Sequence, residues 1–183
     1  EALTESIIDN SVIILQASDS VEIKDSLVKA YVGGDGSARI DITAINGSIL
    51  IQEDELGGPT CVLALVDGDG TATITMNSGL GGISITDDLV LADVDGYGSA
   101  TVDLTTAGDI TLTHSQVKAE VELNSEDDIW LNGNEIEAKV KFDAEGSIYL
   151  YDSDVRAVVE LTSYNDCIHL NNRSDVEATV AFY

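Results

Sequence analysis

Aspartate and glycine alternate in three similar turns, and carboxylate oxygens in that setting are suitable ligands for calcium. The turns supply the side chains of Asp35, Asp67, Asp69, Asp93 and Asp95. Their spacing lacks the full ligand pattern of an EF-hand loop and the Gly-Gly-x-Gly-x-Asp repeat of calcium-binding β-rolls. The alternative is a stacked turn in which glycine permits positive φ angles. We expect this structural role, with Ca²⁺ as the one cofactor that the pattern allows.

Ring-bearing side chains recur at regular spacing and form a second candidate, a contact surface. Trp130, Tyr149 and His169 follow one another at intervals of 19 and 20 residues, and Tyr151 lies two positions after Tyr149. Exposed aromatic rings can stack on sugar rings or mediate contacts between fibres. The alternative is that the rings stack on one another and stabilise a sheet.

Catalytic chemistry is not expected. His114 and His169 are the only histidines, and they fall on different repeats without the converging partners that a metal site or a catalytic triad requires. Pairs of carboxylates such as those that cleave sugars arise by chance among 34 acidic residues. The short turns also provide few long loops to wall a cleft. A polysaccharide-degrading enzyme is therefore the least favoured alternative.

The chain is strongly acidic. Its 183 residues include 34 Asp and Glu against 8 Lys and Arg, for a formal net charge of −26. A surface of this sign repels phosphate backbones and anionic lipids, so nucleic acid is not an expected partner. Membrane insertion is not expected either, because no apolar run approaches the roughly 20 residues of a span.

Self-similar segments dominate the second half of the sequence. Val117-Lys-Ala-Glu-Val-Glu-Leu123 recurs in pattern at 136–142, 155–161 and 176–182, at intervals of 19, 19 and 21 residues. Apolar and polar residues alternate in each copy, which is typical of a strand with one buried face. A shorter strand, such as Ile129-Trp-Leu131, lies between the copies. One repeat is thus expected to be a long strand, a turn, a short strand and a second turn.

The first half follows the same plan with longer repeats. Eight positions separate paired alanines in 30–38, 64–72 and 92–100, whereas one alanine fills both roles in the shorter repeats. We therefore expect coils of about 27 residues in the N-terminal half and about 19 in the C-terminal half. Residues 1–10 are expected to be irregular or a partial first coil, and 53–60 an inserted loop.

Repeats of this length bury a face only by stacking on one another. Equivalent strands then run in the same direction and pair in parallel, and without crossover helices the natural closure is a β-helix. The predicted fold is an all-β, right-handed parallel β-helix (β-solenoid) that forms a single domain over 1–183, the hand following the general chirality of parallel connections. Cys61 and Cys167 would lie roughly 24 Å apart along the stack, too far for a disulfide.

Oppositely charged residues line up in this register. One outward column holds Lys118, Glu137, Arg156 and Glu177, and another holds Glu122, Lys141 and Glu160. Opposite charges on adjacent strands contribute roughly 0.2–1 kcal/mol per pair. The alternating signs therefore favour this register and predict a charge ladder between coils.

The repeat resembles those of filamentous haemagglutinin-like exoproteins, the large bacterial adhesins exported by two-partner secretion. The matching residues are Leu104-Thr-Thr-Ala-Gly-Asp-Ile-Thr-Leu112, with looser copies at 142–150 and 42–51. The likeness covers most of the chain from about Ser11 and includes the 19-residue period. It implies an extracellular or cell-surface rod. The family's N-terminal secretion domain has no match here and the chain is far shorter, as expected for a fragment or a small stacking subunit.

A structural or adhesive role is the function that these patterns favour. Strand edges at both ends of the chain invite pairing with another coil, so that copies stack head to tail into a filament. The chain can equally be a segment of a large surface adhesin. The expected partners are further copies of the chain and a carbohydrate or host surface. Alternatives are a calcium- or carbohydrate-binding module and a bactofilin-like cytoplasmic filament.

Overall fold

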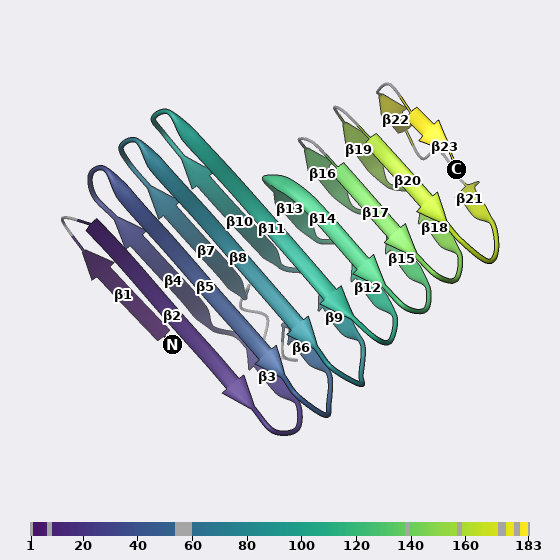
Figure 1. The fold of residues 1–183 in the computed structure, drawn as a ribbon, viewed down its shortest axis with the longest axis horizontal. Helices are drawn as coiled ribbons and strands as arrows, with labels where there is room; N and C mark the ends of the chain where they lie inside the picture. The colour runs from purple at the N-terminus through teal and green to yellow at the C-terminus, as the bar shows by residue number, and fades with distance from the viewer. Residues whose placement is uncertain are drawn as a thin grey trace.

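Three parallel sheets wind around one core in the computed structural model (Figure 1). The structure describes residues 2–6, 9–53, 60–137, 140–156, 159–171, 175–177 and 180–182. In these ranges the chain forms strands and turns without a helix, and so contains no helix that could cross a membrane. The predicted all-β parallel β-helix is confirmed.

Each sheet collects at most one strand from a coil, in chain order, so that among the described residues sheets A and B have eight strands and sheet C has seven. Sheet A contains β1 (Ala2–Ser6), β4 (Leu27–Val32), β7 (Cys61–Val66), β10 (Leu89–Val94), β13 (Gln116–Lys118), β16 (Glu135–Glu137), β19 (Asp154–Arg156) and β22 (Asp175–Glu177). Sheet B contains β2 (Asp9–Ala17), β5 (Gly36–Ala44), β8 (Gly70–Ser78), β11 (Gly98–Thr106), β14 (Glu120–Ser125), β17 (Val140–Ala144), β20 (Val159–Ser163) and β23 (Val180–Phe182). Sheet C contains β3 (Val21–Lys24), β6 (Ile49–Gln52), β9 (Ile83–Thr86), β12 (Ile110–Thr113), β15 (Ile129–Asn132), β18 (Ile148–Tyr151) and β21 (Ile168–Asn171).

A coil has three strands, and the prediction of two was wrong. The long strand of the repeat is divided at an alanine: β13 ends at Lys118, β14 begins at Glu120, and Ala119 lies at the bend with 8% of its surface exposed. A small side chain fits inside this corner, so the chain turns there without a glycine. The alternation of inward and outward residues continues through the bend.

The longer coils widen at the same corner between sheets A and B. Ala30, Ala64 and Ala92 form one register column, and Ala38, Ala72 and Ala100 form another. The added residues lengthen both strands and connect them by a turn, so they do not disturb the rest of the coil. Paired positions are 28 residues apart from Cys61 to Leu89 and 19 apart from Gln116 to Glu135.

The N-terminal segment and the expected loop lie at the beginning of this stack. Residues 2–6 form β1, which pairs with β4, so a regular strand is already present in the segment expected to be irregular or partial. The loop expected at 53–60 connects β6 to β7, and its residues 54–59 lie outside the described part. Cys61 and Cys167 are both free.

Inward side chains stack as aliphatic columns that fill the space between the sheets. The equivalent positions Ile40, Ile74, Val102 and Val121 are at most 1% exposed. Each buried Val, Ile or Leu side chain contributes roughly 1.5–3 kcal/mol relative to an exposed one. Further columns of the same kind contain Ile49, Ile83, Ile110, Ile129 and Ile148 in sheet C, and Val62, Val90, Val117, Ile136 and Val155 in sheet A.

The contrast between inward and outward residues can be tested on β8. We expect Ile74→Ala to destabilise the protein by about 2–5 kcal/mol, because it leaves a cavity in a column that is fully buried. Thr75→Ala, the next residue along but on the outer face, should cost less than about 1 kcal/mol. Denaturant unfolding followed by circular dichroism measures both. Equal losses would contradict the assignment of the two faces.

Candidate functional site

Three rings stack on the outer face of sheet C. Trp130 pairs in register with Tyr149, and Tyr149 with His169, because each occupies the second position of its strand. The ring centroids of Trp130 and Tyr149 are 3.7 Å apart with an interplanar angle of 11°, and those of Tyr149 and His169 are 4.8 Å apart at 3°. The structure thus brings together three of the four predicted contact residues. We call them the aromatic stack.

A groove runs beside the aromatic stack. The neighbouring outward column consists of Thr113, Asn132, Tyr151 and Asn171, two residues further along each strand. The space between the columns has a volume of about 460 Å³, which is within the usual range of ligand sites. Tyr151, the fourth predicted contact residue, lies across the groove from the stack and is 45% exposed.

The Asp-Gly turns join successive coils through their carboxylates. The amide of Asp69 donates to Asp35 Oδ1 at 2.9 Å, and the amide of Tyr97 donates to Asp69 Oδ1 at 2.8 Å. The hydroxyl of Tyr31 donates to Asp67 Oδ2. These carboxylates are therefore already engaged in holding one turn on the next.

Two other acidic residues predicted for calcium lie near these turns. Asp93 is an exposed residue of β10, and Asp95 follows it in the turn, where its amide donates to the carbonyl of Val66 at 2.9 Å. Within the described ranges no group of three or more His, Cys, Asp or Glu is arranged to hold a metal ion. Close packing requires glycine in these turns, since a Cβ on Gly70, the residue after Asp69, would lie 1.8 Å from the carbonyl oxygen of Gly36.

The predicted charge ladder has one segment whose side chains are described. Lys141 Nζ lies 3.2 Å from Glu122 Oε1 on the preceding coil and 2.5 Å from Asp143 Oδ2 on its own strand. Its hydrogen bonds to Asp143 and then Glu122 raise the pKa of Lys141. Glu160 is its register partner on the following coil. Each exposed pair of this kind contributes about 0.2–1 kcal/mol.

For the second charge column the structure describes the backbone pairing but not most of the side chains. Lys118 pairs with Glu137, Glu137 with Arg156, and Arg156 with Glu177. The side chains of the last three residues lie outside the described part. The two columns are on different sheets, A and B, so they are separate features of the surface.

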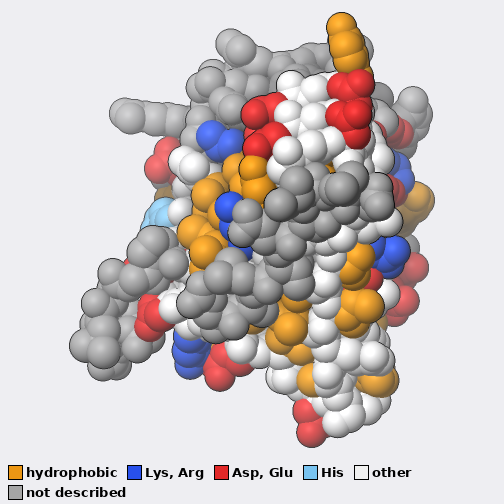
Figure 2. Space-filling view, turned by 90° about the vertical axis from the view of Figure 1, so that its left-hand side faces the viewer, with side chains coloured by type: hydrophobic (Ala, Val, Ile, Leu, Met, Phe, Trp, Pro, Cys, Tyr) orange, Lys and Arg blue, Asp and Glu red, His pale blue; other side chains and the backbone are white. Residues whose placement is uncertain are grey.

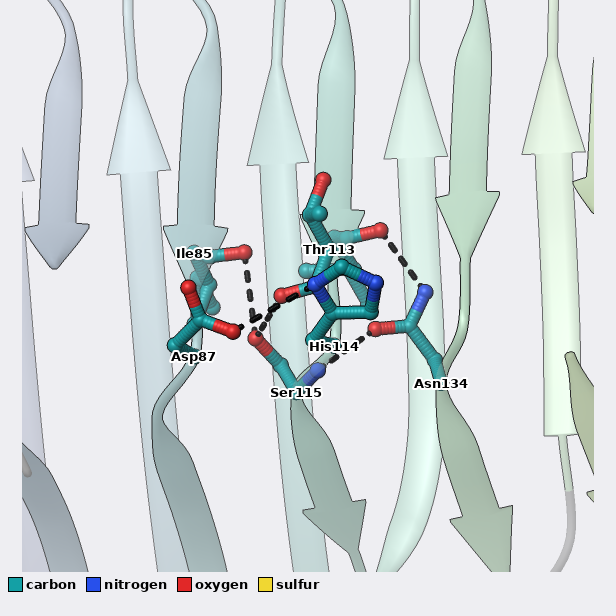
Figure 3. A network of polar contacts seen from close by, with 7 residues as sticks. Ile85, Asp87, Thr113, His114, Ser115 and Asn134 are labelled. Atoms are coloured by element: carbon teal, nitrogen blue, oxygen red, sulfur yellow. Dashed lines mark hydrogen bonds and ion pairs between the residues drawn. The ribbon is translucent and has the colours of Figure 1, made fainter.

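A buried polar column at the corner between sheets C and A was missed from the sequence. It contains Thr60, Asp88, Ser115, Asn134 and Ser153, each at most 4% exposed. Asn134 Oδ1 accepts from the amide of Ser115 at 2.8 Å, and its Nδ2 donates to the carbonyl of Leu112 at 2.7 Å (Figure 3). The available signal was a small polar residue recurring just before each strand of sheet A from β4 onward.

The residue before four members of this column, Asp88, Ser115, Asn134 and Ser153, turns the backbone. Asp87, His114 and Asp152 have φ angles of 59°, 48° and 51°, and Gly133 has 67°. Aspartate tolerates this left-handed region better than most residues. His114 Nδ1 lies 3.4 Å from Asp87 Oδ1 on the neighbouring coil (Figure 3). His114 therefore has a structural position at a corner, far along the chain from the stacked His169.

Asp88 carries a carboxyl group that is only half satisfied. It is 4% exposed, and its Oδ1 accepts from the amide of Thr60 at 2.9 Å. Its Oδ2 has no hydrogen-bond partner among the described residues. Burial raises the pKa of Asp88 to about 6; the Thr60 hydrogen bond opposes this, and the carboxylates of Glu53, Asp87 and Asp25 add to it.

No protein-family model, curated protein or solved structure matches the chain. The likeness to filamentous haemagglutinin-like exoproteins therefore stays a prediction from the repeat residues. What the geometry provides is a surface for contact, namely the aromatic stack and its groove, and two kinds of polar column that hold the coils in register.

Replacing Asp88 by asparagine tests the half-satisfied carboxyl. At the equivalent position Asn134 donates its side-chain amide to the carbonyl of Leu112 on the preceding coil. For residue 88 the equivalent carbonyl on the preceding coil is that of Ile51. A buried carboxyl with a raised pKa favours folding while protonated, so the wild type loses stability as pH rises from about 4 to about 6. Asp88→Asn lacks this loss and should be more stable at pH 7–8 by up to about 3 kcal/mol.

The measurement is the free energy of unfolding at several pH values for both proteins. The other carboxylates titrate in both, so the difference between the two curves isolates Asp88. Asp95→Asn, an exposed change in a turn, is the control and should run parallel to the wild type. Parallel curves for Asp88→Asn as well would show that Asp88 ionises normally.

Proposed function

We propose that the chain is a structural and adhesive β-helix that works outside the cell through its outer surface and its coil edges, without catalysing a reaction. One observation carries this proposal: aliphatic columns fill the interior from coil to coil, with residues such as Ile40, Ile74 and Ile110 fully buried. A filled interior leaves contacts with other molecules to the outer surface and the coil edges. The extracellular location rests on the likeness of the repeat to secreted adhesins.

The edge of the first coil supports association along the stack. Within the described residues, β2 is hydrogen-bonded to β5 on one side only. The carbonyl of Ala17 accepts from the amide of Ile45 on the second coil at 3.0 Å. Because backbone groups of a parallel strand alternate in direction, those of Val12, Ile14 and Gln16 face away from the second coil. Such a row of outward-facing backbone N–H and C=O groups is a template for another strand.

Two of the outward side chains of β2 at the same end are apolar. Val12 and Ile14 are 44% and 66% exposed. Figure 2 looks at this end and shows hydrophobic side chains beside acidic ones. A second copy that adds its last coil here makes a contact that does not close on itself and so produces a filament. Further coils of a longer chain would satisfy the edge in the same manner.

Electron microscopy of the purified chain tests the stacking of copies. We expect unbranched rods in negative stain, and sedimentation that increases with protein concentration. Ile14→Pro should abolish both, because it removes an amide that faces the free edge, a place where proline is tolerated. Ile14→Ala is the matched control, since it removes the same side chain and keeps the amide.

Two outcomes decide the matter. Rods that survive Ile14→Pro, or a chain that stays monomeric at every concentration, would contradict stacking through β2. Addition of millimolar calcium tests the Asp-Gly turns in the same experiment. Because Asp35 and Asp69 already accept hydrogen bonds from the next coil, rod formation should not depend on calcium.

A further inference from the structure

The aromatic stack has covered faces and one open face. Tyr149 lies between Trp130 and His169, so both faces of its ring are occupied. Trp130 is covered on the side of Tyr149 only. On its other side the register partner is Thr111, whose side chain is too short to cover an indole, and Trp130 is 43% exposed. The stack therefore ends in an indole face that a ligand ring can reach.

The residues around the open face combine a platform with hydrogen-bonding groups. Thr111 and Thr113 offer hydroxyls and Asn132 offers an amide, all lining the groove beside Trp130. An aromatic wall with a few fixed polar groups is the usual composition of a ligand site. The negative face of an indole attracts C–H groups, and a sugar ring presents C–H groups on its flat face and hydroxyls around its rim.

Charge selects among ring-shaped ligands. Neither Asp nor Glu is found among the described residues that line the groove, in a chain with a net charge of −26. The overall field repels anions, which disfavours uronic acids, sialic acids and nucleotides. The groove itself supplies no fixed carboxylate to recruit a cation. Because the field repels anions and the described lining holds no carboxylate to pair with a cation, an uncharged ligand fits the groove best.

We propose that the groove is a binding site for neutral glycans, in which one sugar ring stacks on the open face of Trp130 over Thr111. Its hydroxyls bond with Thr113 and Asn132, and the rest of the glycan follows the groove towards Tyr151. This proposal builds on the adhesive function proposed above and names the ligand of its contact surface.

Trp130 is the single tryptophan of the chain, so its fluorescence reports on this site alone. The probes are the neutral hexasaccharides of glucose, mannose and N-acetylglucosamine, with hexagalacturonate as the anionic comparison. We expect a saturable change in emission with at least one neutral probe and none with hexagalacturonate. Calorimetric titration gives the affinity independently and serves variants without tryptophan.

The decisive variant is Thr111→Tyr. A tyrosine there extends the stack by one ring and covers the indole face, so thermal stability should be kept while the affinity falls at least about tenfold. Trp130→Ala should abolish binding as well. Tyr97→Ala is the control: it removes an aromatic ring that is 89% exposed on a turn away from the groove, and it should bind like the wild type.

Any one of three results overturns the proposal: no neutral probe binds, hexagalacturonate binds in preference, or Thr111→Tyr binds like the wild type. The filament experiment is separate, since Ile14 lies on sheet B at the first coil. Loss of rods with sugar binding intact would reject stacking alone, and rods without sugar binding would reject the glycan site alone.

Discussion

Coils stacked at the spacing of hydrogen-bonded strands, about 4.8 Å, place every side chain directly over its equivalent in the next coil. Each column must therefore hold residues that tolerate their own kind as neighbours. Aliphatic side chains do so inside, as in the column of Ile40 and Ile74. Outside, flat rings satisfy the constraint by stacking, and charged residues satisfy it by alternating in sign, as Glu122 and Lys141 do. At the corners, polar side chains accept amides from the adjacent coil.

The columns could be predicted from the sequence because side-chain direction alternates with a period of two. The third strand could not. Val117, Ala119 and Val121 keep pointing inward while the chain bends between them, so the alternation is unbroken and reads as one strand. A corner made by a small inward residue leaves no glycine or proline to mark it. The widened corner of the longer coils is also built from small inward residues, since its insertions fall between two alanine columns.

The candidate site could be predicted in part from the same repeat spacing. Repeat spacing aligned Trp130, Tyr149 and His169, but which ring faces are covered depends on side-chain orientation, which spacing does not determine. Asp88 was missed because it follows Asp87 directly, and two aspartates after a strand look like a solvated turn. Its burial depends on the path of the coil: the left-handed residue before it directs its side chain inward. Only alignment with Ser115 and Asn134 shows the column.

The direction of the backbone hydrogen bonds has a mechanical consequence. They run from coil to coil along the stack, and the two chain ends lie at opposite ends of it (Figure 1). Tension applied to a terminus therefore peels one strand at a time instead of shearing a whole sheet. A released coil of 19 residues, as between Gln116 and Glu135, extends to about 65 Å at about 3.4 Å per residue, from an axial rise of about 4.8 Å. Such a rod lengthens in steps under load, and the strands of the neighbouring coil are a template on which each released coil can rewind when the load is removed.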